Sequence, residues 1–101
     1  MNSPREEVLD TAKHLIMGDR NNQYGPPTQD FQRTADILNA MGYRGIGGRL
    51  LVSHDVALLI TAVKMSRLVW SPEVMDHWID MAGYAACGHE CVIAENKNVS
   101  S

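Results

Sequence analysis

A polar segment, residues 18–27, carries side chains that could bind a phosphorylated ligand. It reads Gly-Asp-Arg-Asn-Asn-Gln-Tyr-Gly-Pro-Pro and has no hydrophobic periodicity, so it is expected to be a loop. Asp19 could accept hydrogen bonds from a ligand, Arg20 could form a fork with a phosphate, and Tyr24 could stack on a base. The same side chains could instead fasten the loop to the rest of the fold. The sequence leaves both interpretations open.

A second group of charged and aromatic side chains is expected where two helices meet. In chain order these residues are Lys64, Arg67, Asp76, Asp80 and Tyr84. If the two helices form an antiparallel hairpin that turns near Trp70, Lys64 comes level with Asp76 or Asp80. The simpler interpretation is an interhelical ion pair. The functional interpretation is a pocket wall in which the cations bind phosphate and the aspartates bind Mg²⁺ or a ribose hydroxyl.

Length and charge exclude several classes of protein. The chain has 101 residues and a formal net charge of −3, which suits one domain. Because lysine and arginine form no basic patch or stripe, a module that binds duplex nucleic acid is not expected. No segment is long and apolar enough for a membrane span, and the first residues lack an apolar signal region, so we expect a cytoplasmic protein. At helical spacing Cys87 and Cys91 are too far apart for a disulfide and are expected to be reduced.

Apolar residues recur with a helical period, so the sequence predicts an all-α fold. Helices are expected over residues 4–17, 28–41, 53–70 and 72–94. Ser3-Pro4-Arg5-Glu6 is a capping box with proline at the first helical position, and Ser71-Pro72-Glu73 repeats this start signal. The order of elements predicts a small four-helix bundle with a C-terminal antiparallel helical hairpin. Residues 1–95 are expected to form a single helical domain, followed by a flexible polar tail over 96–101.

The segment from Ser53 to Trp70 is expected to be the central helix of the bundle. From Val56 to Val63 the residues are almost all apolar, and no face is polar before Lys64. A helix that is apolar on every side is normally surrounded by other elements. Ser53 is expected to cap its first turn.

One stripe of the last predicted helix starts polar and ends with residues that are usually buried. At about 100° per residue, this stripe contains Asp76, Asp80, Tyr84, Cys87 and Cys91. Free cysteine is among the most buried residue types, so another helix, a second subunit or a ligand is expected to cover the stripe. Because a chain of this length has a modest core, we predict a homo-oligomer with residues 84–91 at its interface.

The spacing of these residues resembles a known family. The pattern consists of Gly18-Asp19-Arg20, Tyr24-Gly25-Pro26, Phe31, Asp55-Val56-Ala57-Leu58, Lys64, Arg67, Asp76, Trp78, Asp80 and Gly83-Tyr84. It is similar to a family of small helical proteins encoded by phages and prophages, for which no activity is established. The resemblance covers roughly residues 7–91. It implies a phage accessory protein that acts in the cytoplasm of the infected host.

A weaker similarity connects the chain to the all-α nucleoside triphosphate pyrophosphohydrolases of the MazG type. These enzymes bind Mg²⁺ through a Glu-Glu-x-x-Glu motif and a Glu-x-x-Asp motif. Glu6-Glu7-x-x-Asp10 resembles the first motif and Asp76-x-x-x-Asp80 resembles the second, with one substitution and one extra residue of spacing. The first group lies opposite the apolar face of its helix, where an acidic first turn also suits the helix dipole.

Three classes of function remain open on these residues. The leading prediction is a protein that binds a nucleotide or another phosphorylated small molecule and could sequester a host signalling nucleotide. The ligand-binding residues would be Asp19, Arg20, Tyr24, Lys64, Arg67 and Tyr84. The enzyme alternative is a Mg²⁺-dependent pyrophosphohydrolase with its metal on Asp76 and Asp80. The third class is a structural or host-protein-binding oligomer without a ligand.

Overall fold

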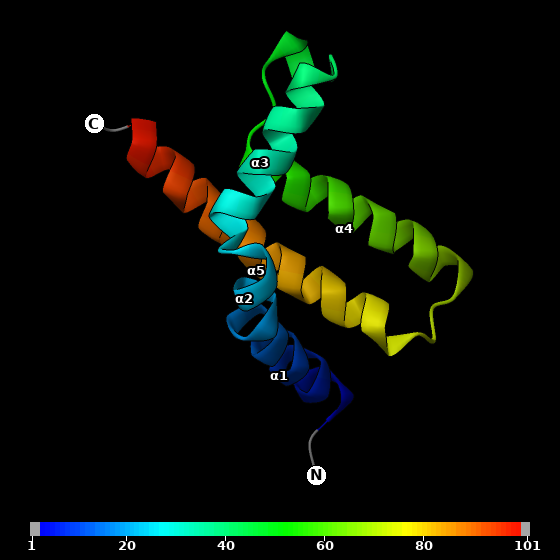
Figure 1. Ribbon diagram of the computed structural model, residues 1–101. Helices are drawn as coiled ribbons and strands as arrows, with labels where there is room; N and C mark the ends of the chain where they lie inside the picture. The colour runs from blue at the N-terminus through cyan, green and yellow to red at the C-terminus, as the bar shows by residue number, and fades with distance from the viewer. Residues whose placement is uncertain (1–2, 100–101) are drawn as a thin grey trace.

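The computed structural model describes residues 3–99, with side chains described for all of them except residues 19–20 and 98–99 (Figure 1). Its elements are α1 (Pro4–Met17), α2 (Asp19–Tyr24), α3 (Pro27–Ala40), a short 3₁₀ turn η1 (Ile46–Gly48), α4 (Ser53–Trp70) and α5 (Met75–Val99). Within this part of the chain there is no strand, so the predicted all-α class is confirmed. No helix among the described residues is both long enough and apolar enough to cross a bilayer.

The first helix begins at the predicted capping box. The backbone N–H of Glu6 donates to Ser3 Oγ at 3.2 Å, and the backbone N–H of Ser3 donates to Glu6 Oε1 at 3.4 Å. Pro4 occupies the first turn, where its missing N–H costs no helical hydrogen bond. These local contacts fix the start of α1, which packs against α5.

The prediction of a loop over residues 18–27 is wrong, because Asp19–Tyr24 forms the short helix α2. Six residues are too few to show a helical repeat of apolar positions, so the sequence carried no periodic signal. Gly25 ends the helix with φ +81°, and its N–H donates to the carbonyl of Asn21 at 3.0 Å. Arg33 of α3 donates to the Tyr24 carbonyl at 2.7 Å and ties this end of α2 to the bundle.

The connector between α3 and α4 is held by polar contacts at both ends. The Asn39 side chain donates to the Leu51 carbonyl and accepts from the Leu51 N–H, both at 2.9 Å. Arg49 makes two hydrogen bonds of 2.8 Å to the Asp55 carboxylate. The hydrogen bond from Arg49 is the main cause that lowers the pKa of Asp55 to about 2.

The cap of α4 differs from the predicted one. Asp55, not Ser53, accepts the hydrogen bond that closes the first turn, from the Val52 N–H at 2.8 Å. Ser53 is buried, and its hydroxyl donates to Glu95 of α5 at 2.6 Å. The serine that looked like a local cap therefore connects two helices far apart in sequence.

The predicted C-terminal hairpin is confirmed, with shifted boundaries. α4 and α5 run antiparallel (Figure 1), but α5 begins at Met75 and not at Pro72. Pro72 lies in the turn, where its carbonyl accepts from Trp78 Nε1 at 2.9 Å. α5 also continues past the predicted end near Ala94 to Val99, so part of the predicted polar tail is helical. Residues 100–101 of that tail lie outside the described residues.

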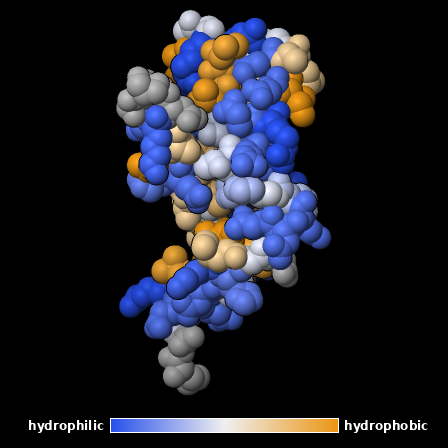
Figure 2. All heavy atoms as spheres, turned by 60° about the vertical axis from the view of Figure 1, so that its left-hand side comes forward, coloured by the Kyte–Doolittle hydropathy of each residue, from blue (hydrophilic) through white to orange (hydrophobic). Residues whose placement is uncertain are grey.

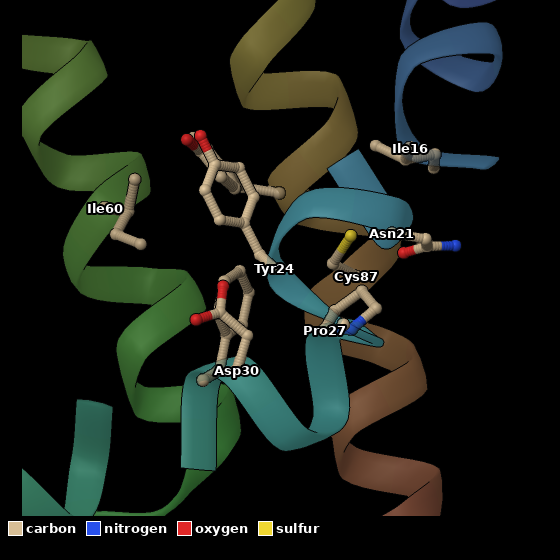
Figure 3. A pocket seen from close by; sticks show the side chains of 10 residues that line it. Ile16, Asn21, Tyr24, Pro27, Asp30, Ile60 and Cys87 are labelled. Carbon is tan, nitrogen blue, oxygen red and sulfur yellow. The ribbon is translucent and has the colours of Figure 1, made fainter. Parts of the chain in front are cut away.

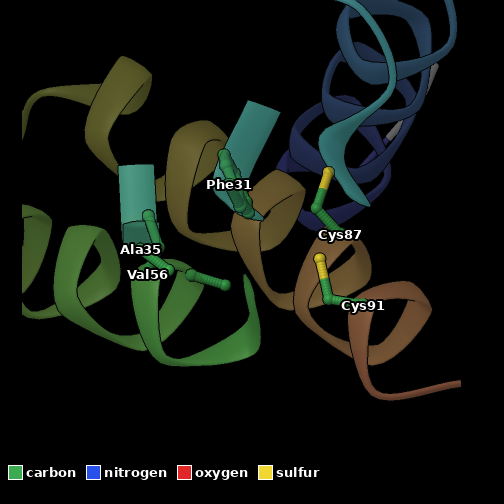
Figure 4. Packing of buried hydrophobic residues seen from close by; sticks show 6 residues of the cluster. Phe31, Ala35, Val56, Cys87 and Cys91 are labelled. Carbon is green, nitrogen blue, oxygen red and sulfur yellow. The ribbon is translucent and has the colours of Figure 1, made fainter. Parts of the chain in front are cut away.

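The core is a small cluster where α3, α4 and α5 meet (Figure 4). Its buried members are Phe31, Ala35, Val56, Ala57, Cys87 and Cys91. Neither cysteine forms a disulfide, as predicted, and burial raises the pKa of Cys91. Elements of the same chain therefore cover the cysteine end of the α5 stripe. The burial of Cys87 and Cys91 therefore requires no subunit interface at residues 84–91.

The expectation that α4 is surrounded on every side is wrong. Val56, Ala57 and Leu68 are buried, but Leu58 exposes 65% and Val69 87% of its surface on the other side of the helix. Among the described elements only α3 and α5 contact α4, because α1 packs on α5 instead. Further apolar side chains are exposed at the end of α3 and in the connector, and they gather at the top of the face shown in Figure 2.

Candidate functional site

A cavity of about 150 Å³ is lined by residues of all five α-helices, α1 to α5 (Figure 3). Its lining residues are Ile16, Asn21, Tyr24, Gly25, Pro27, Asp30, Phe31, Ile60, Tyr84 and Cys87. The walls are mainly apolar, and a few polar groups converge on them. Apolar walls with a few polar groups are typical of a pocket for a small organic molecule, although such pockets usually have volumes of roughly 300–1,000 Å³ and this cavity is smaller.

Two of the predicted ligand-binding residues, Tyr24 and Tyr84, lie together in this pocket. Tyr24 ends α2 and exposes 55% of its surface, so its ring is available to a ligand. Tyr84 comes from α5 and is partly buried, and its ring centroid lies 6.3 Å from that of Phe31, with the two planes tilted by 49°. The two tyrosines, 60 positions apart in the sequence, place aromatic surface on different walls of one cavity.

Asp30 and Asn21 supply the polar side of the pocket. Asp30 lies in the first turn of α3, where a carboxylate also suits the helix dipole. Arg33 lies one turn further along, with its Nη2 at 3.7 Å from Asp30 Oδ1 and at 2.7 Å from the Tyr24 carbonyl. Arg33 therefore joins α3 to the end of α2 and holds the side of the pocket that Tyr24 and Gly25 form.

Lys64 and Asp80 form the interhelical ion pair that the hairpin register predicts, with Nζ and Oδ2 2.9 Å apart. Their side chains expose only 13% and 15% of their surface. Lys64 follows the pocket residue Ile60 by one turn of α4, and Asp80 precedes Tyr84 by one turn of α5. The pair therefore lies just beyond the pocket, at one end of its α4 and α5 walls.

The other predicted residues are not part of the pocket wall. Arg67 and Asp76 are exposed on the hairpin. The side chains of Asp19 and Arg20 lie outside the described residues, although the backbone of both belongs to α2. Within the described part of the chain, no three His, Cys, Asp or Glu side chains come together in a way that could hold a metal ion.

The family that matches residues 7–92 is described as "Domain of unknown function (DUF6378)". The chain belongs to this family. Two similar proteins are both called Gene 55 protein. The one from Mycobacterium phage D29 is 37% identical over 82 residues, which are 81% of this chain and 51% of the relative. The one from Mycobacterium phage L5 is 28% identical over 90 residues, which are 89% of this chain and 55% of the relative.

The DUF6378 match runs from α1 into α5 and includes every residue that lines the pocket. It supports the resemblance to a phage protein family that the sequence pattern indicated. The chain spans about half the length of the two curated relatives. No solved structure matches it.

This DUF6378 domain has a second polar cluster at the other end of the hairpin, which the sequence did not predict. Glu95 accepts hydrogen bonds from Ser53 Oγ at 2.6 Å and from the backbone N–H of His54 at 2.9 Å, and its Oε1 lies 2.7 Å from His54 Nδ1. Burial acts to raise the pKa of Glu95, but the hydrogen bonds from Ser53 and His54 outweigh it and lower the pKa. The antiparallel register that predicted the Lys64 pair also brings the start of α4 near the end of α5. Extending that register would have indicated this cluster.

Proposed function

We propose that this DUF6378 domain binds a nucleotide, with the base in the pocket between Tyr24 and Tyr84. The observation that carries the proposal is the convergence of two tyrosines from distant helices on one cavity with Asp30 and Asn21. Aromatic rings bind bases by stacking, and a small number of polar groups at the edge of the ring orient them. A protein that binds without turnover would sequester its nucleotide inside the infected cell.

The carboxylate in the pocket favours particular bases. Asp30 only accepts hydrogen bonds when ionised, so it suits a base that presents an amino group. Adenine, cytosine and guanine carry exocyclic amino groups, whereas thymine presents a carbonyl oxygen and a methyl group instead. We therefore expect dCMP to bind more tightly than dTMP, a ligand of similar size and the same charge.

The phosphates would lie toward the hairpin. Lys64 and Arg67 follow Ile60 by one and two turns of α4, so both cations lie on the part of this helix that leads away from the pocket. Asp80 balances the charge of Lys64, so the exposed Arg67 is the cation that is available to an anion. A guanidinium binds phosphate through two parallel hydrogen bonds, which gives this end of the site its preference for phosphorylated ligands.

The test is titration calorimetry with the common nucleoside mono- and triphosphates on wild type and two pairs of variants. Tyr24→Ala should weaken binding at least fivefold, because one base–aromatic stack contributes about 1–3 kcal/mol. Tyr43→Ala is the matched control, since Tyr43 exposes 58% against 55% for Tyr24 but lies in the connector. Asp30→Asn should reduce the preference for dCMP over dTMP, whereas Asp36→Asn on the same helix should not.

Two results would contradict the proposal. One is no binding of any nucleotide to the folded protein; the other is equal weakening by Tyr24→Ala and Tyr43→Ala. Each triphosphate is also incubated with Mg²⁺ and assayed for pyrophosphate. If pyrophosphate is released, and Asp76→Asn or Asp80→Asn abolishes this release, the hydrolase alternative would replace the binding function.

A further inference from the structure

The outer side of α4 is an uncovered apolar face. Its apolar members are Leu58, Leu59, Ala62, Val63, Met65, Val69 and Trp70, all exposed, and the exposed, uncharged Ser66 lies among them. Val69 and Trp70 expose 87% and 90% of their surface. Soluble monomers rarely leave a continuous apolar patch of more than a few hundred Å² in water, and larger patches mark interaction sites. We call these seven residues the α4 outer face.

The spacing within this face is that of a helix–helix seam. Leu58, Ala62, Met65 and Val69 follow one another at intervals of four, three and four residues. Intervals of this kind align side chains along one line of a helix and allow them to pack into the gaps of a facing helix. The side chain of Lys64 points instead toward α5, where it pairs with Asp80. The four seam residues are uncharged, and Asp55, which precedes Leu58 in the same spacing, is paired with Arg49 at 2.8 Å.

The solvent-accessible surface of the isolated chain is larger than expected for a folded monomer of its mass. A folded monomer of 11.2 kDa is expected to expose about 5,700 Å², whereas this chain exposes 7170 Å². The excess of about 1,500 Å² is larger than the roughly 800 Å² that each partner buries in a standard interface. The radius of gyration, 14.8 Å, also exceeds the roughly 13 Å expected for a compact domain of this length.

From these observations we infer that the α4 outer face is the interface of a homodimer, in which α4 packs against α4 of a second copy. An interface with two-fold symmetry brings the same patch of both subunits together, so a charged residue near the axis would face its own like charge. The α4 outer face is free of charge and is therefore complementary to itself. The small side chain of Ala62, within the seam, permits close approach of the two helices. This interface is independent of the proposed nucleotide pocket.

The test compares two leucines that are exposed to a similar extent on different helices. Leu58 exposes 65% of its surface on α4, and Leu9 exposes 61% on α1. Multi-angle light scattering of the wild type at about 100 μM should give twice the monomer mass of 11.2 kDa. Leu58→Glu should give the monomer mass, because it places two like charges in an apolar interface. Leu9→Glu should remain a dimer.

Ala62→Glu provides a second variant, which adds charge to the seam without removing a large apolar side chain. It should also be monomeric, and circular dichroism should show wild-type helix content for all three variants. A monomeric wild type would overturn the inference. So would a dimer that persists in both folded α4 variants, or one that Leu9→Glu disrupts as strongly as Leu58→Glu does.

Discussion

Replacing Gly88 with leucine should destabilise the fold by about 1–3 kcal/mol, the usual cost of forcing extra carbon atoms into a packed core. Gly88 lies where α5 crosses α4, and a Cβ built on it would be 3.2 Å from the Cβ of Ala57. Ala57 is only 3% exposed and has no flexible side chain that could move away. A leucine at position 88 therefore has to separate the two helices, which would also disturb the cluster around Cys87 and Cys91.

Urea denaturation of Gly88→Leu, at one fixed protein concentration, measures this effect. Ala86→Leu is the control, because Ala86 is exposed on the same helix and a surface change usually alters stability by less than about 0.5 kcal/mol. Leucine is also a better helix former than glycine, so any loss of stability at position 88 comes from packing and not from helix propensity. Equal stability of the two variants would show that α4 and α5 do not cross as closely as described.

Replacing Glu95 with alanine should cost about 1–3 kcal/mol at neutral pH, the penalty for leaving buried polar groups without partners. Glu95 accepts from the Ser53 hydroxyl and from the backbone N–H of His54. Ser53 is 2% exposed, so water cannot easily replace the lost carboxylate. The variant also removes the hydrogen bonds that connect the start of α4 to the last turns of α5.

Thermal unfolding of Glu95→Ala and Glu90→Ala separates this role from a general effect of removing charge from α5. Glu90 is exposed on the same helix, so its loss should leave the melting temperature almost unchanged. In the Ser53→Ala background, the Glu95→Ala substitution should lower the melting temperature less than it does in the wild type, because the buried hydroxyl is already gone. Equal melting temperatures for Glu95→Ala and Glu90→Ala would show that this cluster does not hold the hairpin together.

Local signals in the sequence predicted the start of one helix and the length of another. The capping box of Ser3 and Glu6 placed the start of α1 correctly, and the apolar run after Ser53 gave the full length of α4. The repeated signal at residues 71–73 was misleading, since Pro72 serves the turn and its carbonyl binds Trp78. A short start motif is misleading where another contact, here the one from the Trp78 side chain, takes a backbone group that the helix would use.

The surroundings of α4 could not be predicted from its composition. A helix that is apolar on every side indicates that partners exist, but does not say whether they belong to the same chain. In this fold α3 and α5 cover one side, while Leu58, Val69 and Trp70 on the other side remain exposed. The apolar run by itself therefore predicts a buried helix, whereas the inferred interface accounts for it through a second copy.

The candidate site was predicted in part. The hairpin register correctly brought Lys64 level with the aspartates, because an antiparallel pair with a short turn fixes which residues face each other. The approach of Tyr24 to Tyr84 could not be derived, since it depends on α2, a helix that the sequence did not reveal. Asp30 and Asn21 were missed for the same reason, because they become pocket residues only once α2 folds over α3.

The most direct test of the nucleotide-binding proposal is a two-dimensional ¹H–¹⁵N correlation spectrum recorded during titration with the tightest-binding nucleotide. Base binding in the pocket predicts the largest amide shifts at residues from different helices that line it, namely Asn21, Gly25, Phe31, Ile60 and Tyr84. Amides of the distant 3₁₀ turn at residues 46–48 should remain unchanged. Shifts confined to the exposed hairpin around Arg67 and Asp76, with none at the pocket residues, would contradict the proposal.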